Sequence, residues 1–506
     1  MSQGGPSFWI ETSPDTDYPA LPDGVSVDVA VVGAGITGVT AAVLLKRAGK
    51  TVALIDSKQI VRGATGYTTA KVTAGHGLSY TKIKDSFGAD GARIYAESNL
   101  AALERIAQFV EEDGIDCDFE RRANYAYAEG AEQVAQVKEE VEVEKAAGLP
   151  VSMVTETPLP FEVKAALRME NQAQFHPRKY LLALAATISG DGSHVFEGSP
   201  VTHVKHGDPC EVQTEGGVLR ARDVILATHL PFLDRGLFFT RAYPHRSYAV
   251  AAPLGSAADP EGMYINAGTP TRSIRTLRDG DDVYLQVGGN GHKTGDEEET
   301  PKKYDELEEF LREHWPGAGE VRYRWSTQDY MAHDKVPYIG QLRRGSEHLL
   351  VATAYSKWGM TNGTVAAMIL SDRILGRENA WAGLYDSKRL KPLGTKSFLK
   401  ENASAGLHFF SDRLARSDRS SVDDLKPGEG GLIRVRGRKT AVYRDEQGTL
   451  HAMSPVCQHL YCVVGWNPAE RSWDCPCHGS RYAGDGRAIQ GPTRKDLKPR
   501  KLPDPS

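Results

Sequence analysis

The chain has 506 residues, and this length predicts about three domains. Hydrophobic residues make up 40% of the chain, charged residues 25%, and the formal net charge is −5. This composition is ordinary for a globular protein and excludes a strongly basic surface for nucleic acid or for an anionic membrane. No apolar run of about eighteen residues is present, so we expect no transmembrane segment. The first residues lack the basic and apolar regions of a secretory signal, and we expect a cytoplasmic protein.

The first patterned segment follows a Pro- and Asp-rich lead. SVDVAVVGAG is a short apolar run that ends in glycines, which predicts a buried parallel strand. ITGVTAAVLLKRAG has helical spacing and closes on Gly49, and TVALID is a second buried strand. The order strand, turn, helix, strand predicts a βαβ unit.

The turn of this unit reads Gly33-Ala34-Gly35-Ile36-Thr37-Gly38, and Asp56 ends the second strand. Gly33 permits a tight turn, Gly35 lets backbone N–H groups approach a pyrophosphate, and Gly38 lets the helix pack closely on the strand. Asp56 would accept hydrogen bonds from an adenosine ribose. The spacing predicts a dinucleotide site, with a purely structural glycine turn as the alternative. The motif by itself does not separate FAD from NAD.

The middle of the chain predicts helices and an antiparallel sheet. Residues 91–112 and 131–147 have helical patterns, and the second stretch is highly charged. Residues 246–290 alternate apolar and polar side chains with many glycines, which predicts antiparallel strands. KKYDELEEFLREHWPG predicts a helix that ends before Pro316. HLLVATAY predicts another buried strand, and NGTVAAMILSDRILG predicts a helix with Asn362 as its cap.

Residues 25 to about 390 resemble the D-amino-acid-oxidase-like flavoproteins, the family of glycine oxidase and monomeric sarcosine oxidase. The segments that carry the resemblance are VAVVGAGITG, GATGYTTAKVTAGHG, FHPRKYLLALA, VILATH, DKVPYIG and VATAYSKWGMTNGTVAAMIL. Only the first is specific alone, and the order and spacing of all six carry the match. The resemblance implies FAD as cofactor, a split FAD-binding domain and an inserted antiparallel substrate domain. It also implies oxidation of a C–N bond in an amino acid or a secondary amine.

The same resemblance implies which residues lie along the FAD. Near the isoalloxazine ring it places Lys357, Trp358, Gly359, Met360, Thr361 and Asn362, and along the rest of the cofactor Ala64, Thr65 and Gly66. A helix from about Thr361 would aim its partial positive charge at the ring edge where negative charge builds on reduction. Lys357 either adds to that charge or is a solvated loop lysine. Some relatives attach FAD through a histidine, and His76 is a weak positional match for such an attachment.

Enzymes of this kind need groups that orient the substrate, often an arginine paired with a carboxylate. The candidates for substrate-site or catalytic residues are Arg246, Tyr248, Arg275, Trp325 and Lys357. Each residue of the expected substrate sheet has an alternative role, as a sheet-surface or core residue.

A second motif lies near the end of the chain. Cys457-x-His459 is followed, after fifteen residues, by Cys475-x-x-His478. Two Cys and two His can bind zinc in a tetrahedral site. They can also hold a Rieske [2Fe–2S] centre, in which one iron takes both thiolates and the other both imidazoles. One Cys and one His in each loop favours the Rieske centre, and residues of about 425–505 resemble a Rieske domain.

The resemblance is to the respiratory type of Rieske protein. In that type, residues placed like Cys462 and Cys477 form a disulfide, whereas Rieske oxygenases usually carry a Trp at the second position. A cytosol keeps most thiols reduced, so the bond stays a hypothesis here. Ser480 and Tyr482 match hydroxyls that donate to cluster sulfur and ligand thiolate and raise the potential, or they are plain surface residues. The pair Gly491-Pro492 matches the loop that covers the cluster.

The expected fold class is an α/β Rossmann-like FAD-binding domain with an inserted α+β antiparallel-sheet substrate domain, plus a small all-β Rieske domain. The expected divisions are a lead at 1–24, the oxidoreductase at 25–390, a linker at 391–424 and the Rieske domain at 425–506. Within the oxidoreductase, the FAD-binding parts are about 25–95, 175–235 and 326–380, and the substrate domain is about 96–174 and 236–325.

The fusion predicts a dehydrogenase, because a flavin takes two electrons from a C–H bond while a Rieske centre carries one. Electrons would pass from FAD to the cluster and then to an external acceptor, either a soluble redox protein or a quinone. The alternatives are a non-catalytic redox carrier or sensor, and an oxidase that uses oxygen and has a structural Rieske domain. A Rieske oxygenase would need a mononuclear iron held by two His and a carboxylate, for which the flavoprotein body leaves no room. The expected substrate is a small amine or amino acid.

Overall fold

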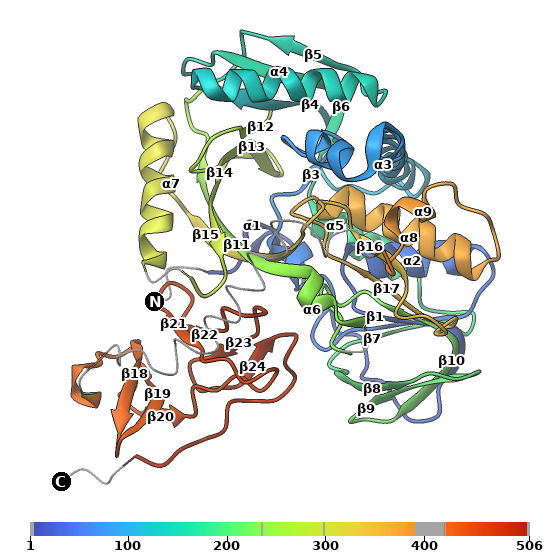
Figure 1. The fold of residues 1–506 in the computed structure, drawn as a ribbon, viewed down its shortest axis with the longest axis vertical. Helices are drawn as coiled ribbons and strands as arrows, with labels where there is room; N and C mark the ends of the chain where they lie inside the picture. Colours follow the sequence, from blue (N-terminus) through green and yellow to red (C-terminus); the bar gives the residue numbers. More distant parts are fainter. Residues whose placement is uncertain (1–4, 234–235, 297–298, 390–418, 420, 503–506) are drawn as a thin grey trace.

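The computed structural model describes residues 5–233, 236–296, 299–389, 419 and 421–502. Most of the linker expected at 391–424 therefore lies outside the described residues. Figure 1 shows a helix-flanked sheet, an antiparallel sheet beside it and a small β region at the end of the chain. Among the described residues, no helix combines the length and the apolar character needed to cross a bilayer.

The first sheet contains the predicted βαβ unit. Strand β1 pairs in parallel with β2 on one side and with β10 on the other, and β10 pairs in parallel with β17. The order along the sheet is β16 Tyr338–Gln341, β17 Leu349–Thr353, β10 Val218–Leu226, β1 Ser26–Val32, β2 Val52–Ile55 and β7 His194–Phe196, and β8 Val201–Lys205 and β9 Cys210–Thr214 continue from β10. Strands β2 and β17 are buried throughout, as expected for strands covered on both faces.

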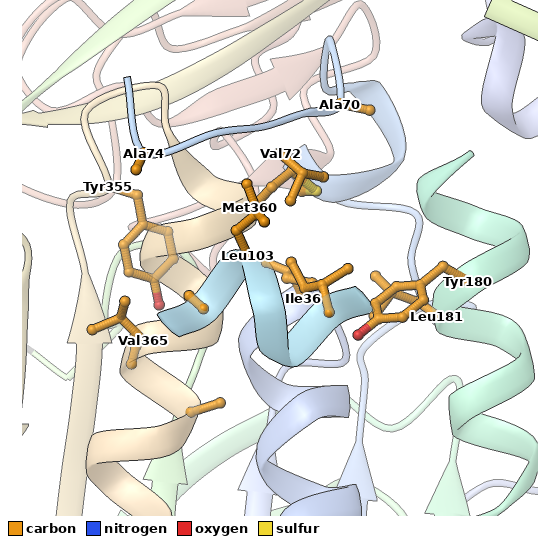
Figure 2. Packing of buried hydrophobic residues seen from close by; sticks show 14 of the residues in the cluster. Ile36, Ala70, Val72, Ala74, Leu103, Tyr180, Leu181, Tyr355, Met360 and Val365 are labelled. Atoms are coloured by element: carbon orange, nitrogen blue, oxygen red, sulfur yellow. The ribbon is translucent and has the colours of Figure 1, made fainter. Parts of the chain in front are cut away.

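Helices cover this sheet and pack on one another. They are α2 Ile36–Arg47, α3 Tyr80–Glu112, α5 Pro177–Ala186, α8 Gly359–Ile374 and the short α9 Ala382–Tyr385. Figure 2 shows side chains of four of these helices and of the 70–74 segment meeting around Ile36 at the start of α2. The labelled neighbours are Val72, Leu103, Tyr180, Leu181, Tyr355, Met360 and Val365. This core fixes the start of α2 against the start of α8.

The second sheet contains the predicted antiparallel strands, and its one parallel pairing among the described residues joins β12 to β4. Its order is β15 Tyr323–Ala332, β11 Ala242–Pro253, β14 Asp282–Lys293, β13 Arg272–Asp279, β12 Gly262–Asn266, β4 Glu120–Ala128, β6 Ala165–Gln174 and β3 Lys71–Val72, with β5 Val151–Val154 beside β6. Helix α4 (Ala131–Ala146) lies against β4, β5 and β6, and α7 (Thr300–His314) against β11 and β14. Helix α7 ends before Pro316, as predicted.

The end of the chain forms two small antiparallel sheets. One contains β18 Gly430–Val435, β19 Arg438–Arg444 and β20 Leu450–Met453. The other contains β21 Gly465–Asn467, β22 Ser472–Asp474, β23 Arg481–Ala483 and β24 Ala488–Gln490. A short 3-10 helix, η4 Val422–Asp424, precedes them. This all-β region confirms the fold class expected for the last part of the chain.

Four features differ from the sequence expectations. The lead contains a helix that the sequence analysis did not predict: α1 (Phe8–Glu11) buries Phe8 and Trp9, because Ser7 caps it and the two rings pack into the main core. Helix α8 begins at Gly359 rather than near Thr361, so Asn362 lies in its first turn. Helix α3, which is kinked at Gly88, and strand β15 run across the expected boundaries at 95/96 and 325/326, because neither is interrupted at those positions.

Candidate functional site

The glycine turn after β1 has the shape of a dinucleotide cradle. Gly33 has φ of +102°, and a Cβ on it would lie 2.5 Å from the carbonyl oxygen of Ala227. A Cβ on Gly38 would lie only 1.8 Å from the carbonyl oxygen of Gly33, so the helix needs glycine there. Gly35 is the N-cap of α2 and contributes no side chain at the start of that helix, where anions bind. The turn therefore fits the pyrophosphate of FAD.

Asp56 and residues 64–66 lie beside this turn. The Asp56 carboxylate accepts hydrogen bonds from the backbone N–H of Ala34 at 2.9 Å and of Lys58 at 3.0 Å. Burial raises the pKa of Asp56, although these backbone bonds oppose the shift. The hydroxyl of Thr65, in the short helix η1 (Ala64–Tyr67), accepts from the N–H of Ile36 at 3.2 Å. The structure thus brings these sequence-predicted segments together at the carboxyl edge of the parallel sheet, where nucleotides bind in such folds.

The segment Lys357–Asn362 is tied to the same edge. The hydroxyl of Tyr355, just before it, bonds to Thr37 Oγ1 of α2 at 2.6 Å. Within α8, Thr361 donates to the carbonyl of Thr73 at 3.1 Å, and the Asn362 amide donates to the Tyr95 hydroxyl at 3.1 Å. The N-terminus of α8, which carries partial positive charge, therefore lies next to the N-terminus of α2. This arrangement fits a flavin whose ring becomes negative on reduction.

His76 is held as a neutral structural side chain. Its Nδ1 bonds to the Tyr95 hydroxyl at 2.7 Å, and its Nε2 lies 2.8 Å from the carbonyl of Thr73 and 3.1 Å from Thr361 Oγ1. Its ring stacks on Trp358 with centroids 4.7 Å apart. Burial lowers the pKa of His76 to about 3. Because both ring nitrogens are engaged, we do not propose covalent attachment of FAD through His76.

Lys357 lies where the two sheets face each other. Its Nζ donates to the Ser247 hydroxyl of β11 at 2.9 Å, and its backbone N–H donates to Asp329 of β15. The side chain is solvent-accessible, yet the surrounding protein lowers its pKa to about 8, with Asp329 opposing and Lys335 adding to the shift. A side chain that solvent can reach, with other protein groups around it, can bind a small ligand.

Two further groups lie around Lys357, and we call Lys357, Lys335, His245 and Ser247 the Lys357 group. A Cβ on Gly291 would lie 2.5 Å from His245 Cε1 and 2.8 Å from Lys357 Nζ, so these two side chains flank the same glycine. Burial lowers the pKa of His245, and the Lys357 charge adds to this. Its Nδ1 is buried without a hydrogen-bond partner. The group therefore combines cations, a hydroxyl and a neutral imidazole, which suits an anionic substrate group.

Arg246 and Tyr248 face the other way. The pairing of β11 with β14 shifts register between these two residues, and their contacts place both side chains away from Lys357. Arg246 donates to the Ser326 hydroxyl and lies 3.7 Å from Glu470 of the last part of the chain. The Tyr248 hydroxyl bonds to His292 Nε2 at 2.9 Å. The structure therefore does not bring either residue to the Lys357 group.

Arg275 and Trp325 are held by backbone carbonyls. The Arg275 guanidinium donates to the carbonyls of Thr276 at 2.9 Å, Thr69 at 3.0 Å, Ala70 at 2.5 Å and Phe175 at 3.5 Å. Burial lowers its pKa to about 9. The Trp325 indole N–H donates to the carbonyl of Tyr67 at 3.1 Å. These bonds fasten the 67–70 segment to the sheet and hold the Arg275 guanidinium among backbone carbonyls.

The two predicted cluster loops meet at the end of the chain. The Tyr482 hydroxyl donates to Cys457 Sγ at 3.2 Å, and a contact with Cys475 lowers the pKa of the Cys457 thiol. The rings of His459 and His478 lie 5.1 Å apart. Burial, together with His459, lowers the pKa of His478 to about 3, which keeps its imidazole in the neutral form that binds metal. Two adjacent thiols and two adjacent imidazoles fit the donor set of a Rieske centre.

The predicted disulfide is present between Cys462 and Cys477, with sulfur atoms 2.09 Å apart. Both sulfur atoms lie within 4.8 Å of Cys475 Sγ, so the bond lies directly beside a cluster ligand. The Ser480 hydroxyl accepts from the N–H of Thr493 at 3.1 Å and also helps to lower the pKa of Cys457. Ser480 and Tyr482 therefore both reach the ligand site, and Ser480 also holds the loop that contains Gly491-Pro492.

A cavity of about 670 Å³ lies elsewhere, between strand β16 and the end of α8. Its walls include Asp223, His348 and Arg373, and it contains none of the residues predicted for the site. Within the cavity, His348 Nδ1 lies 2.9 Å from Asp223 Oδ1. We assign it no ligand, because nothing converges there besides ordinary surface ion pairs.

Sequence reasoning missed part of the Lys357 group. His245, Ser247 and Lys335 carry no motif, and they meet only because β11 pairs with β14 and β15. Asp329 was missed for the same reason. The segment DKVPYIG contains Lys335, and in the structure both Lys335 and Lys357 have left-handed backbone, with φ of 68° and 73°.

Comparison with known proteins supports both halves. The family model for an FAD dependent oxidoreductase matches residues 28–373, and that for a Rieske [2Fe-2S] domain matches residues 418–501. Over 497 residues the chain is 37% identical to YhfW of Bacillus subtilis (strain 168), which is named as a Rieske 2Fe-2S iron-sulfur protein, and the match covers 97% of each chain.

Two further likenesses concern single parts of the chain. The cytochrome b6-f complex iron-sulfur subunit of Synechococcus sp. is 48% identical over 109 residues, which cover 20% of this chain and 63% of that subunit. The crystal structure of glycine oxidase from Geobacillus kaustophilus gives a TM-score of 0.62 at 18% identity, and covers 72% of this chain and 100% of that chain. The chain thus belongs to the D-amino-acid-oxidase-like family of FAD-dependent oxidoreductases, and its cofactors are FAD and a Rieske [2Fe–2S] cluster.

Proposed function

We propose that the protein is a dehydrogenase for a small amino acid, and that it passes the electrons one at a time through its Rieske domain to an external acceptor. The observation that carries the proposal is the position of strand β15. Asp329 on one face of β15 holds the backbone of Lys357, and Gln328 on the other face donates to the carbonyl of Gly479 in a cluster loop at 2.9 Å. One strand therefore lies between the flavin-side segment and the cluster loops.

The residues of the chain bind and orient the substrate. Lys357 Nζ and the Ser247 hydroxyl are placed to hold a carboxylate, and Lys335 adds positive charge. When bound, FAD accepts two electrons and a hydrogen from the C–N carbon, and the cluster carries single electrons. Water later converts the released imine to a carbonyl compound and ammonia or an amine.

We assign the substrate carboxylate to Lys357 and not to one of the arginines expected from the sequence. The Arg275 guanidinium bonds backbone carbonyls, and Arg246 Nη1 is bonded to Ser326 and lies 3.7 Å from Glu470, although Arg246 Nε and Nη2 are buried without a hydrogen-bond partner. Lys357, by contrast, lies just before helix α8. A carboxylate on Lys357 would place the adjacent amine-bearing carbon near the positive end of that helix. The similarity to glycine oxidase, which acts on an amino acid by its name, supports this class. The cytoplasmic location and the choice between a soluble redox protein and a quinone stay predictions.

An anaerobic mixing experiment tests the proposal. The purified holoprotein is mixed with single small amino acids and with the matching amines that lack a carboxylate. Flavin absorption and the electron paramagnetic resonance of the cluster are recorded together. We expect flavin bleaching with an amino acid, weaker bleaching with its decarboxylated amine, and a reduced Rieske signal that follows. Bleaching with a cluster that stays oxidised, although dithionite reduces it, would contradict the electron route and favour an oxidase with a structural Rieske domain.

A further inference from the structure

Strand β15 presents alternate side chains to the two halves of the molecule. Thr327 and Asp329 share the face that meets Lys357, whereas Gln328 and Tyr330 share the face that meets the cluster loops. Strand β15 is the edge strand of its sheet, so on one side its backbone groups are left for other partners. The segment before Lys357 uses this edge.

Tyr330 is bonded to both sides at once. Its hydroxyl donates to the carbonyl of the cluster ligand His478 at 3.2 Å, and lies 3.2 Å from the carbonyl of Gly491 in the loop that covers the cluster. Its own carbonyl accepts from the N–H of Ser356 at 3.1 Å. Ser356 is the residue before Lys357. Tyr330 therefore connects His478 to the segment before Lys357 through one hydrogen bond on each side.

The surroundings of Tyr330 keep this connection in place. The side chain is 1% exposed. Its ring packs against His229 with centroids 4.9 Å apart, and Gln328 Nε2 lies 3.3 Å from its oxygen. The Ser356 hydroxyl accepts from the N–H of Ala332 at 3.1 Å, which anchors Ser356 to the same strand.

Among the described residues, the Rieske domain also contacts the rest of the chain through other elements, as when Lys58 donates to the carbonyl of Ile489 at 3.3 Å. Phe239 packs against the rings of His459 and His478 at 5.2 and 5.0 Å, but it lies on the short helix α6 (Phe238–Arg241) and not on β15. The Tyr304 hydroxyl and Arg246 meet Glu470, at 2.9 and 3.7 Å. These contacts fasten the Rieske domain to the substrate sheet at a distance from Ser356.

We propose that Tyr330 is a positioning residue for electron transfer, and that its hydroxyl and backbone carbonyl link the His478 loop to the flavin-side segment. The inference rests on the proposed function, because it names the route of that transfer. Two electrons leave each substrate, and the cluster accepts one at a time, with one ferric ion becoming ferrous. An external one-electron acceptor must therefore remove the first electron before the second passes along Tyr330.

The test uses the full-length holoprotein with Tyr330→Phe, which removes the hydroxyl and keeps the ring. Gln328→Met is the comparison variant. It removes the other hydrogen bond from β15 to the cluster loops and the 3.3 Å bond from Gln328 to the Tyr330 hydroxyl, and it keeps that hydroxyl and its bonds to the cluster loops. The flavin is reduced by light with a sacrificial donor, so no substrate needs to be known. The rate of cluster reduction, its resonance spectrum and its potential are measured in each protein.

We expect cluster reduction to slow by roughly tenfold in Tyr330→Phe. An activation barrier that is higher by the free energy of about one hydrogen bond slows a reaction by this factor. Gln328→Met should stay near the wild-type rate. The spectrum and the potential should stay unchanged in both variants, which shows that the cluster itself is intact. Equal slowing in both variants would mean that β15 only fastens the domains, and a wild-type rate in Tyr330→Phe would also overturn the proposal.

The outcomes of the amino-acid experiment and of the light-driven experiment distinguish a failure of this proposal from a failure of the proposed function. If no amino acid bleaches the flavin while light-driven transfer still depends on Tyr330, the substrate class fails and the route stands. If light reduces the flavin of the wild-type protein and the cluster stays oxidised, the electron route and the role of Tyr330 both fail. If Tyr330→Phe is poorly folded, Tyr330→His keeps a ring and a donor, and restored transfer in that variant would support the proposal, while slow transfer despite a native spectrum would count against it.

Discussion

The two cofactor regions of this chain are built in opposite ways. The cluster region takes its four predicted ligands from residues 457–478, and a disulfide closes its two loops on each other. The flavin region draws on the ends of β1, β2 and β17, on the 64–70 segment and on a sheet contributed by distant residues. The first is compact and covalently closed, and the second depends on packing between segments hundreds of residues apart. The two regions should therefore fail separately, and for different physical reasons.

The largest effect should come from a cluster ligand. Cys475→Ser removes a thiolate that one iron needs, so we expect complete loss of the Rieske resonance signal and of iron, with FAD retained. Metal analysis and absorption spectra of the purified variant check this. Cys210→Ser is the control, since Cys210 is a buried cysteine outside any disulfide, and it should keep both cofactors. Loss of FAD in Cys475→Ser would show that the two regions are not independent.

A buried arginine should show how the flavin region depends on packing. Arg275→Met removes a guanidinium that bonds four backbone carbonyls, and leaves those acceptors buried. We expect a loss of roughly 4 kcal/mol in the free energy of unfolding. Thermal and denaturant unfolding followed by flavin fluorescence measure it. A variant of normal stability with poor substrate affinity would instead return Arg275 to the substrate site.

The sequence predicted these two regions unequally. Cys457, His459, Cys475 and His478 are close in the chain, so spacing alone was enough to find them. The glycine turn was readable for the same reason. Arg246 and Arg275 had the right chemistry, but which face of a strand meets the flavin side depends on pairings of β11 and β13 that no local pattern contains. Ser247 and Lys335 were missed because their shared neighbour, Lys357, is distant in sequence.

The disulfide between Cys462 and Cys477 should stabilise the cluster region. Replacing both Cys462 and Cys477 by Ala opens a link across 15 residues, which should cost about 3 kcal/mol of stability if the loss follows loop entropy. The visible absorption of the cluster during heating reports the unfolding of this domain. The flavin region should unfold as in the wild type. A wild-type protein that unfolds identically with and without a reductant would contradict a stabilising bond.

Lys357 should have a smaller and more selective effect. Lys357→Met keeps the length of the side chain and removes the charge, which should lower kcat/KM for an amino acid by about 30-fold, the worth of one charge-assisted hydrogen bond. The decarboxylated amine should be affected less. Lys84→Met, at an exposed position of α3, is the control. Equal losses for the acid and the amine would argue against a carboxylate on Lys357.

The pH dependence should show the smallest effect. The pKa of Lys357 is lowered to about 8, so its charge is present below pH 8 and is lost as the pH rises through that value. KM for an amino acid should therefore rise above pH 8, by about tenfold per unit at most. Steady-state kinetics from pH 6 to about 10 measure it. In Lys357→Arg the rise should disappear, because a guanidinium stays charged over this range.

The buried helix α1 has a consequence for the order in which the chain folds during synthesis. The Phe8 ring lies 5.2 Å from that of Tyr323 and 5.1 Å from that of Tyr284, so its partners leave the ribosome after most of the protein has been made. Strand β1 likewise waits for β10, and β10 for β17. The flavoprotein part must therefore fold late and as one unit, with its first residues among the last to find their places. During that interval the exposed aromatic segment depends on chaperones or on rapid completion of the chain.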